Sequence, residues 1–278
     1  MGVIASKIWE PVDNIGRKVL QIIEYTKQVL LMVYLSIRAA IFDQAQGMRD
    51  IIRVVSMQIY FTGFQAMALI TTLALATGSI VIMQSSAQLS ILGGSDMIGK
   101  LMLIIIVREV GPLLTALIVI ARSGTAVASE LGNMRVNKEV TALESMGINP
   151  LSYIVFPRLV GGIISVLCLA FYFSVIALIG GFFVSRLTHD MSFAYYTASL
   201  ASAFEVNDVY MFLLKNTFSG MIIFVVCCYQ GFQVEKSPHE VPQATTKAVV
   251  NSIIYVVGFN LLVTTLFYLK NLMDLGVL

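Results

Sequence analysis

The sequence predicts an all-α integral membrane protein with five transmembrane helices, an N-terminal interfacial amphipathic helix and a cytoplasmic coupling helix. Of its 278 residues, 58% are hydrophobic and only 12% are charged, and the mean hydropathy is +0.85. A soluble domain is closer to half apolar and about a quarter charged. Because lipid gives backbone polar groups no partners, long apolar runs of this kind cross a membrane as helices.

Five apolar runs are each long enough to cross a hydrocarbon core of about 30 Å at about 1.5 Å per residue. We place these spans at about 57–83, 100–121, 158–185, 208–232 and 246–269. They make one transmembrane domain over 57–270, with a connecting segment at 123–150. Residues 1–56 form an N-terminal region, and residues 271–278 form a short tail.

The placement of the basic residues predicts the orientation. Thirteen of the 18 Lys and Arg side chains lie before the first span or in the second and fourth connections, which share one side of the membrane. Cytoplasmic segments carry an excess of Lys and Arg. We therefore expect a cytoplasmic N-terminus and an extracytoplasmic C-terminal tail.

The N-terminal region carries the pattern of an amphipathic helix. Apolar residues recur at three- and four-residue spacing from Ile15 to Ile41, with charged residues elsewhere on the wheel. The most apolar part, Val29 to Phe42, includes Arg38 and is too short to span. We expect it to lie in the membrane interface. A helix packed under the bundle without lipid contact is the alternative.

The first span is rich in small residues, among them Gly63 and Gly78. Small residues let two helix backbones approach closely in a membrane. The pattern is typical of a packed helix interface and equally of a cavity wall, so both interpretations stay open.

The second span contains two adjacent charges, Arg108 and Glu109, about 12 Å from its outer end. At such depth each charge costs about 2.5–3.5 kcal/mol on the translocon scale. Neighbours in sequence point to different sides of a helix, so each charge needs another partner or an aqueous cavity. A helix kink is predicted at Gly111 and Pro112, because Pro112 has no N–H for the carbonyl of Arg108. A structural ion pair between helices is the alternative to a functional role.

The connecting segment 123–150 is too polar to span and yet is well patterned. Small residues at 123–126 are expected to turn the chain into the cytoplasm, and a short amphipathic helix is expected over about 126–147. Asn137 is the expected N-cap within it, and Gly147 is the expected residue after its end, with Pro150 beyond. By pattern alone this is a docking element, with an apolar ridge against the bundle and charges toward water or another protein.

The fourth span carries Lys215 about 10 Å from its outer end, close to the depth of Arg108. A lysine near a helix end often extends its amine to the interface. The functional hypothesis is that Lys215, Arg108 and Glu109 share a polar site in a cavity. The two cations would then attract a phosphate headgroup, and Glu109 would hold one of them in place.

The run REVGPLLTALIVIARSGTAVASELGNMRV, followed by LESMGINPL and by Pro-Arg at the third span, is specific. It resembles the MlaE-type permease family, the membrane subunits of bacterial and plastid lipid-transporting ABC systems that work with MCE-domain proteins. The resemblance covers about residues 45–270 and includes Lys215 and the segment Ala244–Val250. One departure is Lys138-Glu139, where the family usually has Glu-Gln. The matching positions are Arg108, Glu109, Gly111, Pro112, Arg122, Gly124, Glu130, Gly132, Met134, Arg135, Met146, Gly147, Asn149, Pro150, Pro157 and Arg158.

The resemblance implies a noncatalytic permease that works as a homodimer with two copies of a separate ABC ATPase and with an MCE-domain lipid-binding protein on the outer side. It implies phospholipid or a related lipid as cargo between inner and outer membranes. It also implies a bacterial inner-membrane location with a periplasmic C-terminus. The helix at about 126–147 would couple to the ATPase. Its candidate contact residues are Glu130, Met134, Arg135, Lys138, Glu139, Leu143, Glu144, Met146 and Gly147.

No nucleotide-binding loop, metalloprotease motif or Ser/His/Asp set is recognisable in the sequence. Cys168, Cys227 and Cys228 lie in apolar spans without metal-type spacing and are expected to pack as small hydrophobes. We therefore expect no catalysis, no cofactor and no metal.

Two other function classes remain. An ion-coupled secondary transporter would use Arg108, Glu109 and Lys215 as a relay, although five spans do not divide into two inverted repeats. A structural membrane anchor would need none of the three charges.

Overall fold

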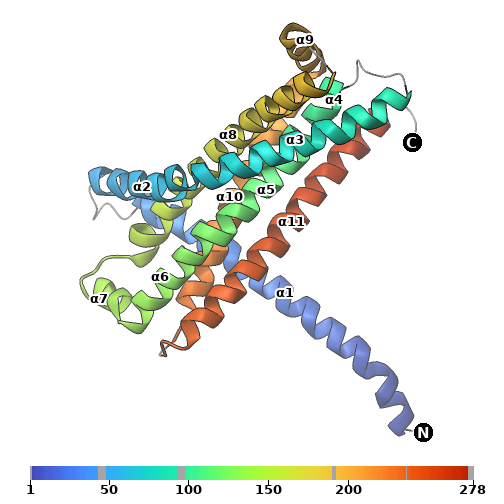
Figure 1. Cartoon of the computed structure of the whole chain (residues 1–278). Helices are drawn as coiled ribbons and strands as arrows, with labels where there is room; N and C mark the ends of the chain where they lie inside the picture. The colour runs from blue at the N-terminus through green and yellow to red at the C-terminus, as the bar shows by residue number, and fades with distance from the viewer. Residues whose placement is uncertain (1, 43–47, 93–97, 190–191, 236, 275–278) are drawn as a thin grey trace.

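The computed structural model describes residues 2–42, 48–92, 98–189, 192–235 and 237–274, and all secondary structure in these ranges is helical. Five helical stretches are long and apolar enough to cross a membrane, which confirms the predicted fold class. They are Ile51–Ala87, Ile98–Val136, Leu151–Leu187, Val206–Phe232 and Glu240–Lys270. In Figure 1 they form one elongated bundle, with α4 and α9 at one end and α2, α6 and α7 toward the other.

The elements follow one another as a chain of helices joined by short turns. The α-helices are α1 (Gly2–Phe42), α2 (Met48–Thr62), α3 (Met67–Leu92), α4 (Ile98–Met102), α5 (Gly111–Val119), α6 (Thr125–Val136), α7 (Glu139–Ser145), α8 (Phe156–His189), α9 (Phe193–Ala203), α10 (Val206–Phe232) and α11 (Glu240–Asp274). A 3₁₀ turn, η1 (Phe64–Ala66), joins α2 to α3. Three π-helical segments are η3 (Leu103–Val110), η4 (Ile120–Gly124) and η5 (Leu151–Val155). Helix α11 thus runs into the predicted 271–278 tail, whose residues 275–278 lie outside the described ranges.

The small residues of the first span pack against the third span. Residues at every fourth position of α3 are buried, among them Ile70, Ala74 and Ile82. Gly78 lies on the same stripe, and a Cβ placed on it would stand 1.9 Å from the carbonyl oxygen of Ala177 in α8. Of the two interpretations left open for this span, the structure supports a close helix interface at Gly78.

The fourth span is the centre of the bundle and the fifth is at its edge. In α10, 67% of the most apolar 18-residue window is buried, against 17% for α11. Close approach of α10 to α8 depends on Gly220, where an added Cβ would be 3.0 Å from Cα of Ile163. One face of α11 therefore remains open in the single chain.

The second span continues well past its predicted end. The expected turn at 123–126 is wrong, because helix runs without a break from Ile98 to Val136. The Thr125 hydroxyl donates to the carbonyl of Ala121 at 2.9 Å and so stays within the helix. At Gly124 an added Cβ would be 3.0 Å from Sγ of Cys227. The small residues thus serve packing against α10 and do not form a turn.

The chain reverses at Asn137 and Lys138 instead. Lys138 has a φ of 60°, in the left-handed region. Asn137 is not an N-cap, as was predicted, but follows α6, and its amide donates to Oε1 of Glu139 at 3.3 Å. The predicted helix at 126–147 is therefore two helices, the end of α6 and the short α7. Gly147 has a φ of +75° directly after α7, which fits its predicted place.

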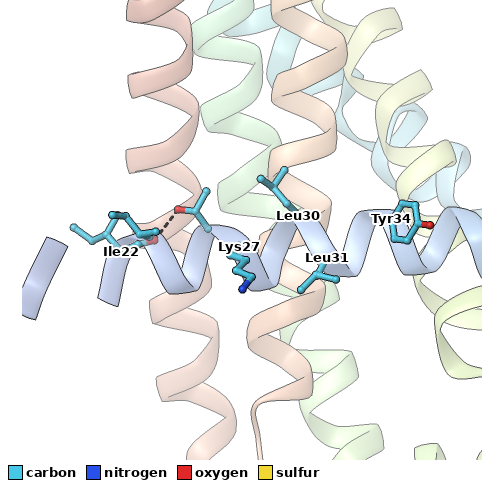
Figure 2. A pocket seen from close by; sticks show the side chains of 7 residues that line it. Ile22, Lys27, Leu30, Leu31 and Tyr34 are labelled. Carbon is cyan, nitrogen blue, oxygen red and sulfur yellow. Dashed lines mark hydrogen bonds between the residues drawn. The ribbon is translucent and has the colours of Figure 1, made fainter. Parts of the chain in front are cut away.

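Helix α1 lies across α10 and α11 (Figures 1 and 2). The Tyr25 ring meets Tyr229 edge-on at 5.2 Å and stacks on Tyr255 at 5.8 Å. The amide of Gln230 donates to the Tyr25 hydroxyl at 3.0 Å, and burial raises the pKa of this phenol above its usual value. The bundle contact of the alternative interpretation is thus present. The apolar face of α1 that carries Ile22, Leu30 and Tyr34 is otherwise exposed.

The contact at Gly78 gives a first prediction. Gly78→Ala forces α3 and α8 apart and should lower the free energy of unfolding by about 1–3 kcal/mol, as overpacking does. Gly258→Ala in α11 is the matched control, because no atom lies within 4 Å of the added Cβ. Thermal unfolding in detergent measures both. Equal stability of the two variants would contradict the α3–α8 packing.

Candidate functional site

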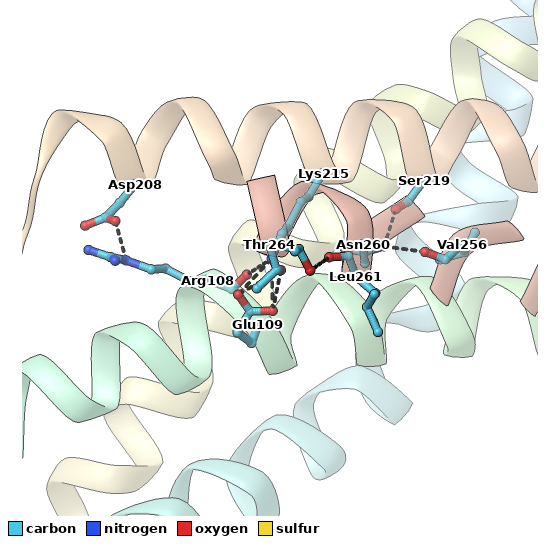
Figure 3. A network of polar contacts seen from close by, with 10 residues as sticks. Arg108, Glu109, Asp208, Lys215, Ser219, Val256, Asn260, Leu261 and Thr264 are labelled. Atoms are coloured by element: carbon cyan, nitrogen blue, oxygen red, sulfur yellow. Dashed lines mark hydrogen bonds and ion pairs between the residues drawn. The ribbon is translucent and has the colours of Figure 1, made fainter. Parts of the chain in front are cut away.

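A cluster of charged and polar side chains lies where η3, α10 and α11 meet (Figure 3). Its α10 residues are in the first half of that helix, which follows α9. We call this cluster the polar site. It consists of Arg108 and Glu109 from η3, Asp208 and Lys215 from α10, and Thr264 from α11. The structure thus brings together the three charged residues selected from the sequence and adds two others.

The backbone of η3 leaves one carbonyl in this site, that of Arg108, without a backbone N–H donor. The N–H of Gly111 donates to the carbonyl of Ile106, five residues back, as in a π-helix. Pro112 has no N–H, so it cannot pair with the carbonyl of Arg108. The chain was predicted to kink at Gly111 and Pro112. A π-helical segment ends at this point and α-helix resumes at Gly111, while the kink itself stays a prediction.

The amine of Lys215 donates the hydrogen bond that Pro112 cannot donate. Its Nζ donates to the Arg108 carbonyl at 2.8 Å and lies 3.0 Å from each carboxylate oxygen of Glu109. It also contacts the Thr264 hydroxyl at 2.8 Å, and that hydroxyl is 3.1 Å from the Glu109 oxygens. The Lys215 side chain is only 1% exposed. The amine therefore points into the bundle and does not extend along α10 to the interface.

Arg108 pairs with Asp208, whose side chain is fully buried. The other carboxylate oxygen of Asp208 accepts from the backbone N–H of Glu205 at 3.0 Å, in the capping box that starts α10. The guanidinium carbon of Arg108 also lies 5.7 Å from the centre of the Phe267 ring. Arg108 is thus held between α10 and α11.

Sequence reasoning missed Asp208 and Thr264. The sequence places Asp208 at the first residue of the predicted fourth span, and a carboxylate at a helix end needs no special explanation. The available signal was its spacing of seven residues from Lys215, which places both on one face of a helix, two turns apart. Thr264 gave no comparable signal, because threonine is common in membrane helices and bonds to its own backbone.

The site is balanced in charge and closed on most sides. Two cations face two carboxylates, and the smaller polar pair Asn260 and Ser219 continues the contacts between α11 and α10 at 3.1 Å. Glu109 is the exception, since its side chain is 36% exposed. Two ion pairs join η3 to α10, the Thr264 hydroxyl adds α11 by hydrogen bonds, and one carboxylate is left open to a further partner.

The residues proposed for partner contact lie at the other end of the same long helix. Glu130 is bound to Arg158 of α8 at 2.9 Å, although its side chain is 60% exposed. Met134, Arg135 and Leu143 are half-buried, whereas Lys138, Glu139, Glu144, Met146 and Gly147 are exposed. The second half of the predicted apolar ridge consists of Val140, Leu143 and Met146. It is shorter than expected, because Val140 is buried but Met146 is 65% exposed. In the described residues no group of three or more His, Cys, Asp or Glu side chains could hold a metal ion.

Comparison with known proteins finds permeases that match most of the chain. The family model described as Permease MlaE matches residues 55–266, which include the polar site and α7. A probable ABC transporter permease protein of Rickettsia prowazekii is 34% identical over 211 residues, covering 76% of this chain and 82% of the relative. The intermembrane phospholipid transport system permease protein MlaE of Haemophilus influenzae is 26% identical over 212 residues, covering 76% and 81%.

The buried ion pair gives a second prediction. Asp208→Ala leaves Arg108 without its carboxylate and should lower the free energy of unfolding by about 3–5 kcal/mol. Glu130→Ala removes a partner that is largely exposed and should cost about 1 kcal/mol or less. Reversible unfolding in detergent measures both variants. A loss at Asp208 no greater than that at Glu130 would rule out a buried structural pair.

Proposed function

Because the chain belongs to the MlaE permease family, we propose that it is the membrane-spanning permease subunit of an ABC transporter that moves phospholipid or a related lipid between inner and outer membranes. The observation that carries the proposal is the course of one helix. From Ile98 to Val136 it joins the polar site, inside the membrane, to the exposed α7. A permease driven from outside the membrane needs such a connection.

The drive comes from a separate ATPase, in two copies, that binds α7 and the end of α6 on the cytoplasmic side. Support comes from the exposure of Lys138, Glu139, Glu144 and Met146 at this tip. An exposed methionine among charges suits a partner pocket better than it suits water. The Lys138-Glu139 departure from the family pattern lies at this contact.

The permease works as a homodimer, with the open face of α11 toward the second copy. Supporting observations are the low burial of α11 and the exposure of Glu109. A carboxylate facing hydrocarbon costs about 2.5–3.5 kcal/mol. A second copy, or a water-filled cavity between two copies, removes that cost. The chain lies in a bacterial inner membrane with its C-terminus periplasmic, where an MCE-domain protein receives or delivers the lipid.

The cations of the polar site serve the phosphate headgroup. In the arrangement described above both are already bound to carboxylates, so a headgroup must displace Asp208 or Glu109 to reach them. Glu109 is the more exposed of the two, and it is the carboxylate that a lipid in a central cavity would meet first. A displaced carboxylate would then favour return of the empty site after the lipid leaves.

The transport proposal is tested on the complex purified from its native membrane. An ATPase should copurify, and ATP should drive phospholipid transfer between proteoliposomes and an acceptor. An ion-coupled transporter would instead lack an ATPase and respond to an ion gradient, and this result would refute the ABC assignment. A purely structural anchor predicts unchanged transfer in Arg108→Ala and Glu109→Ala.

The coupling contact gives a third prediction. Met146→Asp places a charge where the partner pocket is proposed and should weaken ATPase binding by roughly tenfold, or about 1.4 kcal/mol. His239→Asp is the control, because His239 is also exposed and lies in the connection between α10 and α11, outside the proposed contact. Affinity measured by titration of the purified ATPase separates the two. Equal binding would place the ATPase contact elsewhere.

The headgroup role gives a fourth prediction. Lys215→Ala and Arg108→Ala should each reduce photocrosslinking of a headgroup-labelled phospholipid to the purified complex, because each removes a cation. Asn260→Ala removes a polar group one turn away and keeps both cations, so its labelling should match wild type. Undiminished labelling in both cation variants would show that the ion pairs are structural.

A further inference from the structure

Two adjoining hollows lie against α8, beside Val175 and Leu178. One, of about 220 Å³, lies between α8 and α10 and includes Phe171 and Asp208 in its lining. The other, of about 390 Å³, lies between α8 and α9. Val175 and Leu178 line both, so the two hollows adjoin, and together we call them the α8 groove.

Helix α9 covers part of the α8 groove and is held in place by contacts with α8 and α4. The Tyr196 hydroxyl donates to the carbonyl of Leu178 at 3.0 Å, and its side chain is buried. The Phe182 ring meets Phe193 edge-on at 5.2 Å. On its other side, α9 is tied to α4, because the N–H of Gly99 donates to the Ser199 hydroxyl at 3.2 Å. The hollow beneath α9 is therefore built into the fold.

One wall of the α8 groove adjoins the polar site. Asp208 lines the groove and is paired with Arg108 on the other side. Ser174 lies beside it, and its hydroxyl is already bound to the Ala170 carbonyl at 2.9 Å. Both polar groups are thus satisfied within the protein, and an occupant of the groove meets mainly apolar side chains.

The dimensions favour a single hydrocarbon chain. From Phe171 to Phe183 the groove follows about 18 Å of helix, close to half of a hydrocarbon core of about 30 Å. A partner helix about 10 Å wide would fill roughly 1400 Å³ over that length, far more than either hollow offers. Because α8 and α10 are membrane spans, the medium at the groove mouth is itself hydrocarbon.

We propose that the α8 groove binds one acyl chain of a phospholipid from the leaflet at the α9 end of the bundle, with the chain lying against the Asp208 wall of the polar site. This inference rests on the proposed function and adds a second, lateral lipid site to it. A lipid held there is separated from Arg108 by Asp208. Opening of the Arg108–Asp208 pair would then join the two sites.

The test uses a phospholipid with a diazirine in its acyl chain, added to the purified complex and photolysed after detergent washing. Val175→Trp fills the groove and should lower labelling of peptides spanning 171–183 and 204–212 by roughly tenfold. Ile164→Trp is the matched control. Ile164 lies three turns away on the same face of α8, and it is 38% exposed against 39% for Val175.

Equal labelling in the two variants, absence of labelling in these peptides of the wild type, or a crosslink from position 175 to a protein partner would each overturn the proposal. ATP-driven lipid transfer is measured on the same wild-type preparation. Transfer without groove labelling removes the lateral site and leaves the proposed function intact. Labelling without transfer would refute the proposed function and leave acyl-chain binding to the groove in place.

Discussion

The structure depends on one buried amine. Lys215 cannot be solvated by lipid, so all of its hydrogen bonds must end within the protein. Two helices supply them, through the Arg108 carbonyl, the Glu109 carboxylate and the Thr264 hydroxyl. The carbonyl is available because Pro112 follows four residues later. A carbonyl without a donor and a buried lysine without acceptors would each be destabilising alone, and here the lysine donates to the carbonyl.

That constraint explains how much of the site could be predicted. Charges inside an apolar run are conspicuous, so Arg108, Glu109 and Lys215 were selected correctly as a group that lies together. Their pairing could not be predicted, because it depends on which helix faces which. Asp208 lies at the predicted start of the fourth span, which is two residues too late, since α10 begins at Val206 with Glu205 as its cap. The lipid role of these residues remains a prediction.

Elsewhere the sequence predicts the membrane spans correctly but not the local backbone geometry. The five spans follow from apolar length alone, and the structure contains them. The expected turn at 123–126 was inferred from small polar residues, which also occur where two helices touch. Gly124 lies against Cys227, and only the tertiary contact distinguishes these two uses. Lys138 carries no signal for the left-handed conformation that reverses the chain there.

Because the chain does not turn at 123–126, continuous helix joins the polar site to the start of the α6–α7 turn. Arg108 and Val136 are joined by one uninterrupted helix of about 42 Å. If an ATPase displaces the α7 end, as proposed, the motion would tilt or rotate the segment that holds the Arg108 carbonyl. Two π-helical segments lie along this path, at Leu103–Val110 and Ile120–Gly124. Such segments are weak points in helix geometry and are common at functional sites. The first bears the polar site, so a motion absorbed there would act directly on the contacts of Lys215.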